Sequence, residues 1–345
     1  MNRAYAIVLG SSLLAADVPA DRARQAAPGD SVQSAREGAG QATPNAAGRT
    51  TPNAAGQATP KGAVQVQMRN VAFHVDSTIV LSIHEARGAL RRMQPEHPAF
   101  LDDKHSFILD LDSARIGISP AALGMLLNRY TFAYPGSPLR KLVITIEDGR
   151  LRQKGRMHGI SFDVLGDLSL TPAGELRLHP RDIKAVGIKV GGLMKFFGLR
   201  LEKLVNTDRA RGVRIERDDF ILSPTKLLPP PAVNGRLGGF EVRENEIVQL
   251  FVPPDGRPAQ PLTLPVKAEN YMFFRGGVLR FGKLTMDDTD LLIVDANQGD
   301  TFDFWLDRYN DQLVAGGSRN TRDHGLIVQM PDWSRTDGQT VGRSR

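Results

Sequence analysis

Hydrophobic and polar residues alternate along most of the chain between Val64 and Phe251. Alternation with a period of two is typical of strands that bury one face. Asp148-Gly149 separates two such runs and Ala173-Gly174 separates the next pair. Short Gly-containing connections of this kind favour antiparallel hairpins. The clearest alternating runs are Val64–Met68, Phe107–Leu111 and Leu142–Ile146.

Two helices are expected to interrupt the strands. Ser119 followed by Pro120 is typical of a helix start, with Ser as the N-cap and Pro at the first helical position. The apolar face of this helix would carry Leu123, Leu126, Leu127 and Tyr130. A second helix is predicted over residues 192–205. The expected fold is therefore α+β, with a strongly curved antiparallel sheet wrapped on one or two helices.

A proline-rich segment follows the main β-rich domain, which spans residues 64–252. Four of the ten residues in 252–261 are proline, which removes ladder donors and predicts a linker or a long loop. Beyond it, residues 262–333 predict a smaller C-terminal β-rich layer, with strands over 271–294, a turn at Gly276-Gly277 and a short helix over 302–314. The pattern leaves open whether this layer is an independent domain.

The N-terminal region predicts export. Arg3, the apolar run 4–16 and the small-residue site Val18-Pro19-Ala20 predict a signal peptide over residues 1–20. Residues 21–63 are rich in Ala, Gly, Thr and Pro and predict a disordered tether. A disordered tail is expected over 334–345. We therefore expect a periplasmic or secreted protein; an unprocessed apolar N-terminus is the alternative.

The amino-acid composition excludes several kinds of functional site. The 345 residues contain no cysteine, which excludes disulfides, thiolate zinc sites and cysteine nucleophiles. The net charge of +6 is unevenly distributed: residues 181–217 hold ten Lys or Arg against four Asp or Glu, whereas 285–312 hold eight Asp and one Arg. These blocks either face each other across an internal contact or serve binding, with the basic block on anionic lipid headgroups.

The predicted helix over 192–205 lies inside the basic block and has a broad apolar arc. A basic amphipathic helix can lie at a membrane interface or line a lipid cavity, and an ordinary core helix has the same pattern. On the first interpretation, lipid chains contact this arc and headgroups contact the neighbouring cations. The residues predicted to bind lipid chains are Leu123, Leu126, Leu127, Leu193, Met194, Phe196 and Phe197. Those predicted to bind headgroups are Lys195, Arg200 and Lys203.

No motif points to catalysis, a cofactor or a resident metal. His84-Glu85 is not followed by a histidine at position 88, and Ser223 with Lys226 lacks the partner motifs of acyl-enzymes. The aspartates of the acidic block do not fit the spacing of an EF-hand, and a solvated face is favoured over a calcium site for them. They are Asp287, Asp288, Asp290, Asp295 and Asp300. We therefore expect a protein that is not an enzyme.

The order of elements from Ile118 to Phe251 carries a family resemblance. A leucine-rich helix ends in Leu126-Leu127-Asn128, strands flank Asp148-Gly149, and a second helix region contains Gly191-Gly192-Leu193. Leu227-Leu228-Pro229-Pro230-Pro231 stands near the end. This order resembles the LmeA-like phospholipid-binding proteins and, more distantly, the tubular lipid-binding (TULIP) superfamily. The resemblance implies a curved sheet around a long helix, with an apolar groove for acyl chains.

The expected function is therefore to hold phospholipid or another amphiphile in an apolar groove, without covalent chemistry and with possible contact to a membrane surface. The alternative is a structural or interaction module of the cell envelope that has a solid core and binds an envelope protein. Nucleic acid is not an expected partner, because the leader argues against it and no aromatic stacking residues interleave with the basic ones.

Overall fold

The computed structural model describes residues 62–186, 209–253 and 255–333. Within them the fold is α+β and dominated by sheet, as the alternating pattern predicts. The predicted leader, the tether, the helix over 192–205 and the C-terminal tail lie outside the described residues. No described helix has the length and apolar character needed to cross a bilayer.

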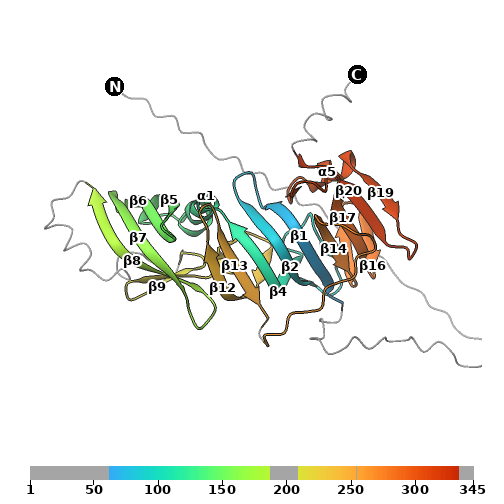
Figure 1. The fold of residues 1–345 in the computed structure, drawn as a ribbon, viewed down its shortest axis with the longest axis horizontal. Helices are drawn as coiled ribbons and strands as arrows, with labels where there is room; N and C mark the ends of the chain where they lie inside the picture. The colour runs from blue at the N-terminus through green and yellow to red at the C-terminus, as the bar shows by residue number, and fades with distance from the viewer. Residues whose placement is uncertain (1–61, 187–208, 254, 334–345) are drawn as a thin grey trace, which may run out of the picture. The chain divides into compact units, whose positions relative to one another are not determined.

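The largest sheet curls into an antiparallel half-barrel with a few parallel pairings (Figure 1). Its eleven described strands include a path in the order β12-β13-β4-β2-β1-β14-β17-β20-β19, with β11 beside β4 and β18 beside β1. The strands that precede the Pro-rich segment are β1 (Val64–His74), β2 (Val80–Arg92), β4 (Phe107–Ile118), β11 (Ala232–Asn234), β12 (Arg236–Val242) and β13 (Ile247–Val252). Those that follow it are β14 (Tyr271–Arg275), β17 (Asp290–Asp295), β18 (Phe302–Trp305), β19 (Gly317–Asn320) and β20 (Leu326–Met330).

A second, six-stranded sheet has the order β5-β6-β7-β8-β10-β9. Asp148 and Gly149 form the turn between β5 and β6 and have φ values of 51° and 73°, which confirms the predicted hairpin. Both residues need positive φ in the turn type that matches strand twist. The strands are β5 (Leu139–Glu147), β6 (Arg150–Met157), β7 (Ile160–Leu170), β8 (Leu176–Val186), β9 (Val213–Glu216) and β10 (Asp219–Leu222).

The C-terminal strands extend the sheet that β1 begins. β14 pairs with β1 in antiparallel register, from Gln65 with Arg275 to Arg69 with Tyr271. The helix predicted over 302–314 is wrong in its first part, where β18 runs parallel to β1. Phe302 and Phe304 are both fully buried, so the segment follows the period of a strand. A third, small sheet contains β3 (Ala99–Phe100), β15 (Val278–Phe281) and β16 (Leu284–Asp287).

The helices within the described residues are short. α1 (Pro120–Leu126) begins at Ser119, whose hydroxyl accepts a hydrogen bond from the Ala122 amide at 3.1 Å and confirms the predicted N-cap. A π-helical turn, η1 (Leu127–Thr131), continues it. The others are α4 (Pro224–Leu227) and α5 (Tyr309–Ala315).

The large sheet has buried apolar residues on both faces. The main core lies on the concave face and extends to the six-stranded sheet. On the other face, Leu262, Leu264, Val266 and Ala268 pack against a small cluster centred on Phe273 and Leu292. Gln67 fixes this segment, because its buried amide accepts from Leu262 N at 2.8 Å and donates to the Tyr271 hydroxyl at 2.7 Å. The segment after the prolines is therefore part of the fold.

Candidate apolar binding site

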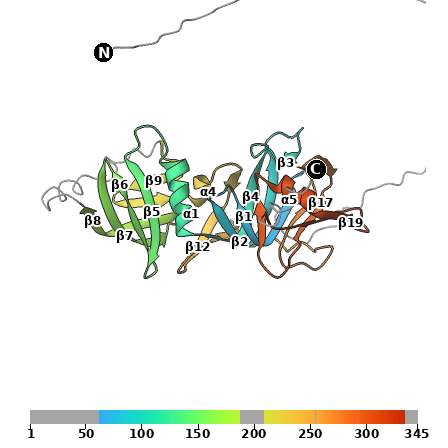
Figure 2. The same cartoon turned by 90° about the horizontal axis from the view of Figure 1, so that it is seen from above.

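The helix α1 lies between the two main sheets (Figures 1 and 2). It packs against β5 of the six-stranded sheet, and its buried residues include Leu123 and Leu126. The segment from α4 to β11 also lies in this space (Figure 2). Helix and segment together separate the concave face of the large sheet from the inner face of the smaller one.

A first cavity of about 110 Å³ lies on the side of the large sheet. Alternate residues of β13 point into it, namely Ile247, Gln249 and Phe251. On β1, β2 and β4 its walls are aliphatic or aromatic, and residues 224–231 supply the opposite wall. Of the residues that line it, Thr225 and Gln249 are the polar ones.

A second cavity of about 50 Å³ lies between α1 and the six-stranded sheet. Its lining is again aliphatic and aromatic, with Gln153 as its polar member. Leu123, Leu151 and Leu222 line both cavities, so these three side chains are common to their walls. Protein interiors contain few voids larger than a water molecule, which makes two adjoining apolar cavities a distinctive feature.

Three of the residues predicted to bind lipid chains lie on these walls. Leu123 lines both cavities, Leu126 lines the first and Leu127 lines the second. The other predicted lipid contacts, Leu193, Met194, Phe196 and Phe197, lie outside the described residues. The predicted headgroup contacts Lys195, Arg200 and Lys203 lie outside them too.

Sequence reasoning missed the contribution of β13. Its interior positions are spaced by two, a signal that the sequence carries, but nothing in the sequence tells which face of a strand meets a cavity. Gln249 is the informative residue, since it is 9% exposed and occupies an interior position between Ile247 and Phe251. An amide at such a position supplies a hydrogen-bond donor and acceptor inside an otherwise apolar chamber.

Hydrogen bonds hold α1 and η1 in place beside β5. The Asn128 amide donates to Leu142 O at 2.7 Å and accepts from Leu142 N at 2.9 Å. Leu142 lies where the register of β5 against β6 shifts, between Arg140 and Val143. A β-bulge leaves backbone groups unpaired. Asn128 therefore satisfies the bulge and docks the helix on the strand at the same time.

The far end of the helix is held by Asp76, a half-buried aspartate. Asp76 Oδ1 accepts from Thr78 N at 2.8 Å and Ile79 N at 3.0 Å, and Oδ2 accepts from the Tyr130 hydroxyl at 3.0 Å. Arg129 donates to the same Oδ2 at 3.1 Å. Burial acts to raise the pKa of Asp76, but the hydrogen bonds from Thr78, Tyr130 and Ile79 outweigh it and lower the pKa.

The cavity walls carry no ionisable side chain among the described residues that form them. General acid–base catalysis and nucleophilic catalysis require such groups or activated hydroxyls within reach of a substrate. The chamber can exclude water and accommodate hydrocarbon, with amides at two points of its wall. Its chemistry is that of a binding site for an apolar group.

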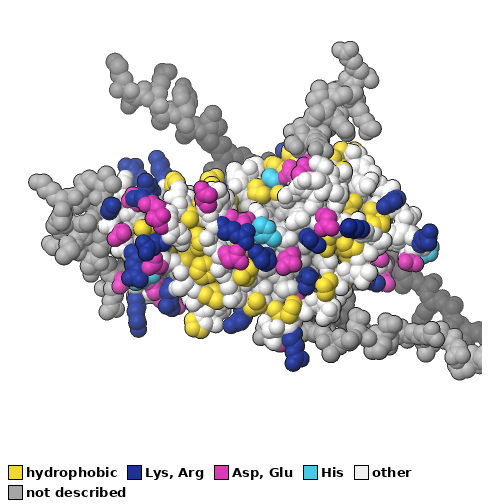
Figure 3. Space-filling model, in the orientation of Figure 1, with side chains coloured by type: hydrophobic (Ala, Val, Ile, Leu, Met, Phe, Trp, Pro, Cys, Tyr) yellow, Lys and Arg dark blue, Asp and Glu magenta, His cyan; other side chains and the backbone are white. Residues whose placement is uncertain are grey.

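The outer face of the six-stranded sheet combines cations with anions (Figure 3). Arg152 Nε donates to Asp163 at 2.8 Å, and this hydrogen bonding holds the pKa of Asp163 below its usual range. Arg181 pairs with Asp167 at 2.7 Å and Arg214 with Glu175 at 2.6 Å. Two cations of the basic block, Arg181 and Arg214, are therefore paired with carboxylates of this sheet and its turns.

No family model, curated protein or solved structure matches the chain. The resemblance to LmeA-like and tubular lipid-binding proteins therefore stays a prediction.

Proposed function

We propose that the protein binds the hydrocarbon part of a phospholipid or another amphiphile between its two main sheets, without covalent chemistry. The observation that carries the proposal is the pair of apolar cavities on either side of Leu123. The predicted leader supports a periplasmic or secreted location, where such a ligand is available from membranes. The LmeA-like resemblance supports the same function.

Filling the two cavities with hydrocarbon is energetically favourable. Unfilled apolar volume costs about 24 cal/mol per Å³, because the lining atoms lose dispersion contacts. At that rate the cavity of about 110 Å³ costs about 2.6 kcal/mol and the one of about 50 Å³ about 1.2 kcal/mol. A hydrocarbon segment that fills both recovers this energy and buries its own apolar surface as well.

The chamber accommodates a longer chain only if it expands. An apolar cavity of about 150 Å³ holds benzene, so the larger cavity as described admits a short hydrocarbon segment. Rotation of Leu123, Leu151 and Leu222, which the cavities share, would join them into one channel along α1. The ligand then stabilises the conformation in which the two cavities are joined. Its contacts with the cavity walls offset the free energy needed to rotate the three leucines.

Hydrophobic side chains come to the surface where the six-stranded sheet meets β12 and β13 (Figure 3). Charged side chains flank this area on the six-stranded sheet. An apolar surface area with a charged rim suits an amphiphile, whose chain contacts the apolar area while its headgroup stays in water. This arrangement supports binding that keeps the headgroup at the molecular surface.

The test measures ligand directly. The full chain is purified, analysed by native mass spectrometry for bound lipid, and mixed with vesicles that contain a fluorescent phospholipid. We expect bound lipid in the purified protein and saturable uptake of the probe. Leu123→Trp replaces an aliphatic side chain between the cavities with a bulky indole ring and should reduce uptake. Val143→Trp, on the exposed face of β5, should leave uptake unchanged. Thermal unfolding of both variants confirms that they fold.

The absence of both lipid and probe uptake in the wild-type protein would overturn the proposal. Uptake that Leu123→Trp leaves unchanged in a folded protein would place the ligand elsewhere and overturn this site. The first of these results would favour the interaction module with a solid core, which predicts an envelope protein captured by cross-linking.

A further inference from the structure

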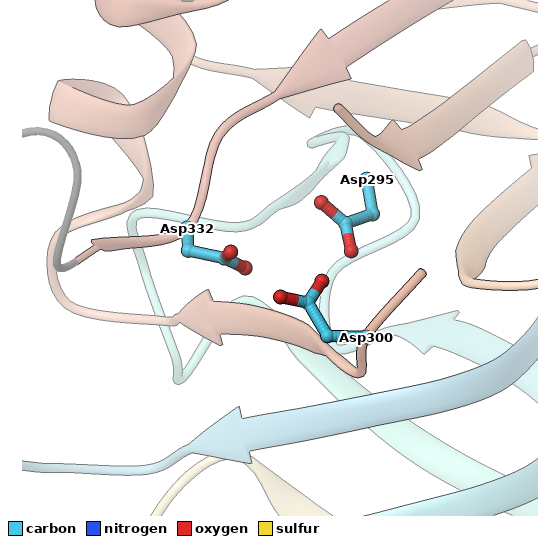
Figure 4. Close-up of side chains that lie close together, drawn as sticks. All are labelled: Asp295, Asp300 and Asp332. Carbon is cyan, nitrogen blue, oxygen red and sulfur yellow. The ribbon is translucent and has the colours of Figure 1, made fainter. Parts of the chain in front are cut away.

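Three aspartates from separate parts of the C-terminal region converge at one edge of the large sheet (Figure 4). Asp295 ends β17, Asp300 precedes β18, and Asp332 follows β20. β17 and β20 are parallel neighbours, so their carboxyl ends meet at the same edge. Spacing alone favours a solvated face for the aspartates of this block, but the fold brings two of them together with Asp332.

The spacing of the carboxylates suits a cation. One oxygen from each of the three lies within 4.8 Å of the other two. A central point between atoms so placed is at most about 2.8 Å from each, and small rotations of the side chains bring it to the roughly 2.3–2.6 Å of calcium–oxygen bonds. In Figure 4 the three carboxylates point toward a common space.

Asp295 supplies a second, independent observation. It is only 2% exposed, and its Oδ1 accepts a hydrogen bond from Asn297 N at 2.9 Å. Its Oδ2 has no hydrogen-bond partner within the part of the chain that the structure describes. A buried carboxylate oxygen without a partner is costly unless a cation compensates it.

We infer that Asp295, Asp300 and Asp332 bind a divalent cation, and that the cation is Ca²⁺. All three ligands are hard oxygen donors without histidine or cysteine, which favours Ca²⁺ or Mg²⁺ over transition metals. Mg²⁺ demands near-ideal octahedral geometry, whereas Ca²⁺ accepts irregular sites of six to eight oxygens. Asp300 is exposed, so the ion has access from solvent and water completes its coordination.

The cation would join the segment before β18 to the ends of β17 and β20, which already pair through Asp295 and Met330. Neighbouring hydrogen bonds already order the site: the Gln298 amide donates to Asp295 O at 2.9 Å, and Asp332 Oδ1 accepts from Asp303 N at 3.1 Å. Bound Ca²⁺ therefore stabilises the end of the sheet where the chain re-enters β18. This inference is independent of lipid binding.

The two tryptophans of the protein provide a selective reporter. Trp333 follows Asp332 directly, and the Trp305 ring lies 5.5 Å from the Trp333 ring. Tb³⁺ replaces Ca²⁺ at oxygen sites and emits when a nearby excited tryptophan transfers energy to it. We expect saturable Tb³⁺ emission from the full-length protein on tryptophan excitation, and its displacement by Ca²⁺ at lower concentrations than Mg²⁺.

Variants localise the site. Asp295→Asn and Asp300→Asn should each weaken Tb³⁺ and Ca²⁺ binding roughly tenfold or more, because affinity follows the number of charged ligands. Asp300 is exposed, so its variant keeps the fold intact. Asp287→Asn, in the same acidic block but on exposed β16, is the matched control and should leave binding unchanged. Ca²⁺ at about 100 times its dissociation constant should raise the wild-type Tm by roughly 5 °C.

Either of two results would overturn the inference. One is the absence of saturable Tb³⁺ emission from the wild-type protein. The other is binding that Asp295→Asn and Asp300→Asn change no more than Asp287→Asn does.

Discussion

A substitution that fills the first cavity tests whether this cavity can accommodate additional hydrocarbon. Ala86 on β2 lines this cavity, and Ala114 on β4 is its direct cross-strand neighbour but does not line it. Both alanines are 5% exposed. Ala86→Leu therefore places three additional carbons next to empty space, whereas Ala114→Leu places the same three carbons in packed core.

The two substitutions should change the free energy of unfolding in opposite directions. Each buried methylene contributes about 0.8 kcal/mol, so three contribute up to about 2.4 kcal/mol. Ordering the leucine side chain costs about 0.5–1 kcal/mol, which leaves a gain of about 1.5 kcal/mol for Ala86→Leu. Ala114→Leu should instead lower the free energy of unfolding by about 1–3 kcal/mol, as overpacking does.

Urea denaturation measures both effects, because a change of midpoint at constant m-value is a change of stability. In the same preparations, Ala86→Leu should take up less fluorescent lipid than the wild-type protein, since its side chain occupies the space of the ligand. If Ala86→Leu loses as much stability as Ala114→Leu, the first cavity cannot accommodate three additional carbons. A hydrocarbon ligand would then not fit there either.

Two further predictions concern the attachment of the helix. Asn128→Ala leaves the Leu142 peptide group at the β5 bulge without its partner and should lower the free energy of unfolding by about 2 kcal/mol, measured by urea denaturation. Asp76→Asn should cost about 2 kcal/mol at pH 7. Because the folded-state pKa of Asp76 is lowered, the difference from wild type should be complete above the ordinary value of 3.8 and shrink as the pH falls through the folded pKa. Equal differences at pH 7 and pH 3 would contradict the assigned role of the Asp76 charge.

Local signals in the sequence predict local structure well here. Ser119-Pro120 defines the start of α1, and the turns at Asp148-Gly149 and Gly276-Gly277 lie where the glycines indicate, since their positive φ values depend on neighbouring residues alone. The helical period predicts that Leu123 and Leu126 of α1 are buried, and alternation predicts the buried positions of β5. For these features the determining interactions act within a few residues.

Long-range pairing could not be predicted in the same way. Nothing local indicates that Phe302 lies in a strand beside Val71, because only the edge of β1 makes the extended conformation favourable there. The same holds for Asp332, which reaches Asp295 through the parallel pairing of β20 with β17. The leucines of α1 in the candidate site could be predicted from periodicity. The cavities and the aspartate cluster could not, because they depend on tertiary packing.

The position of β1 inside the large sheet has a consequence for biosynthesis. Gln65 pairs with Ala89 of β2 on one side and with Arg275 of β14 on the other. β2 is translated soon after β1, whereas β14 is translated about 200 residues later. Until then, one edge of β1 offers unpaired amides and carbonyls that can recruit other chains. A nascent polypeptide that stops before residue 271 should aggregate, and a chaperone that shields residues 64–74 during synthesis should reduce this aggregation.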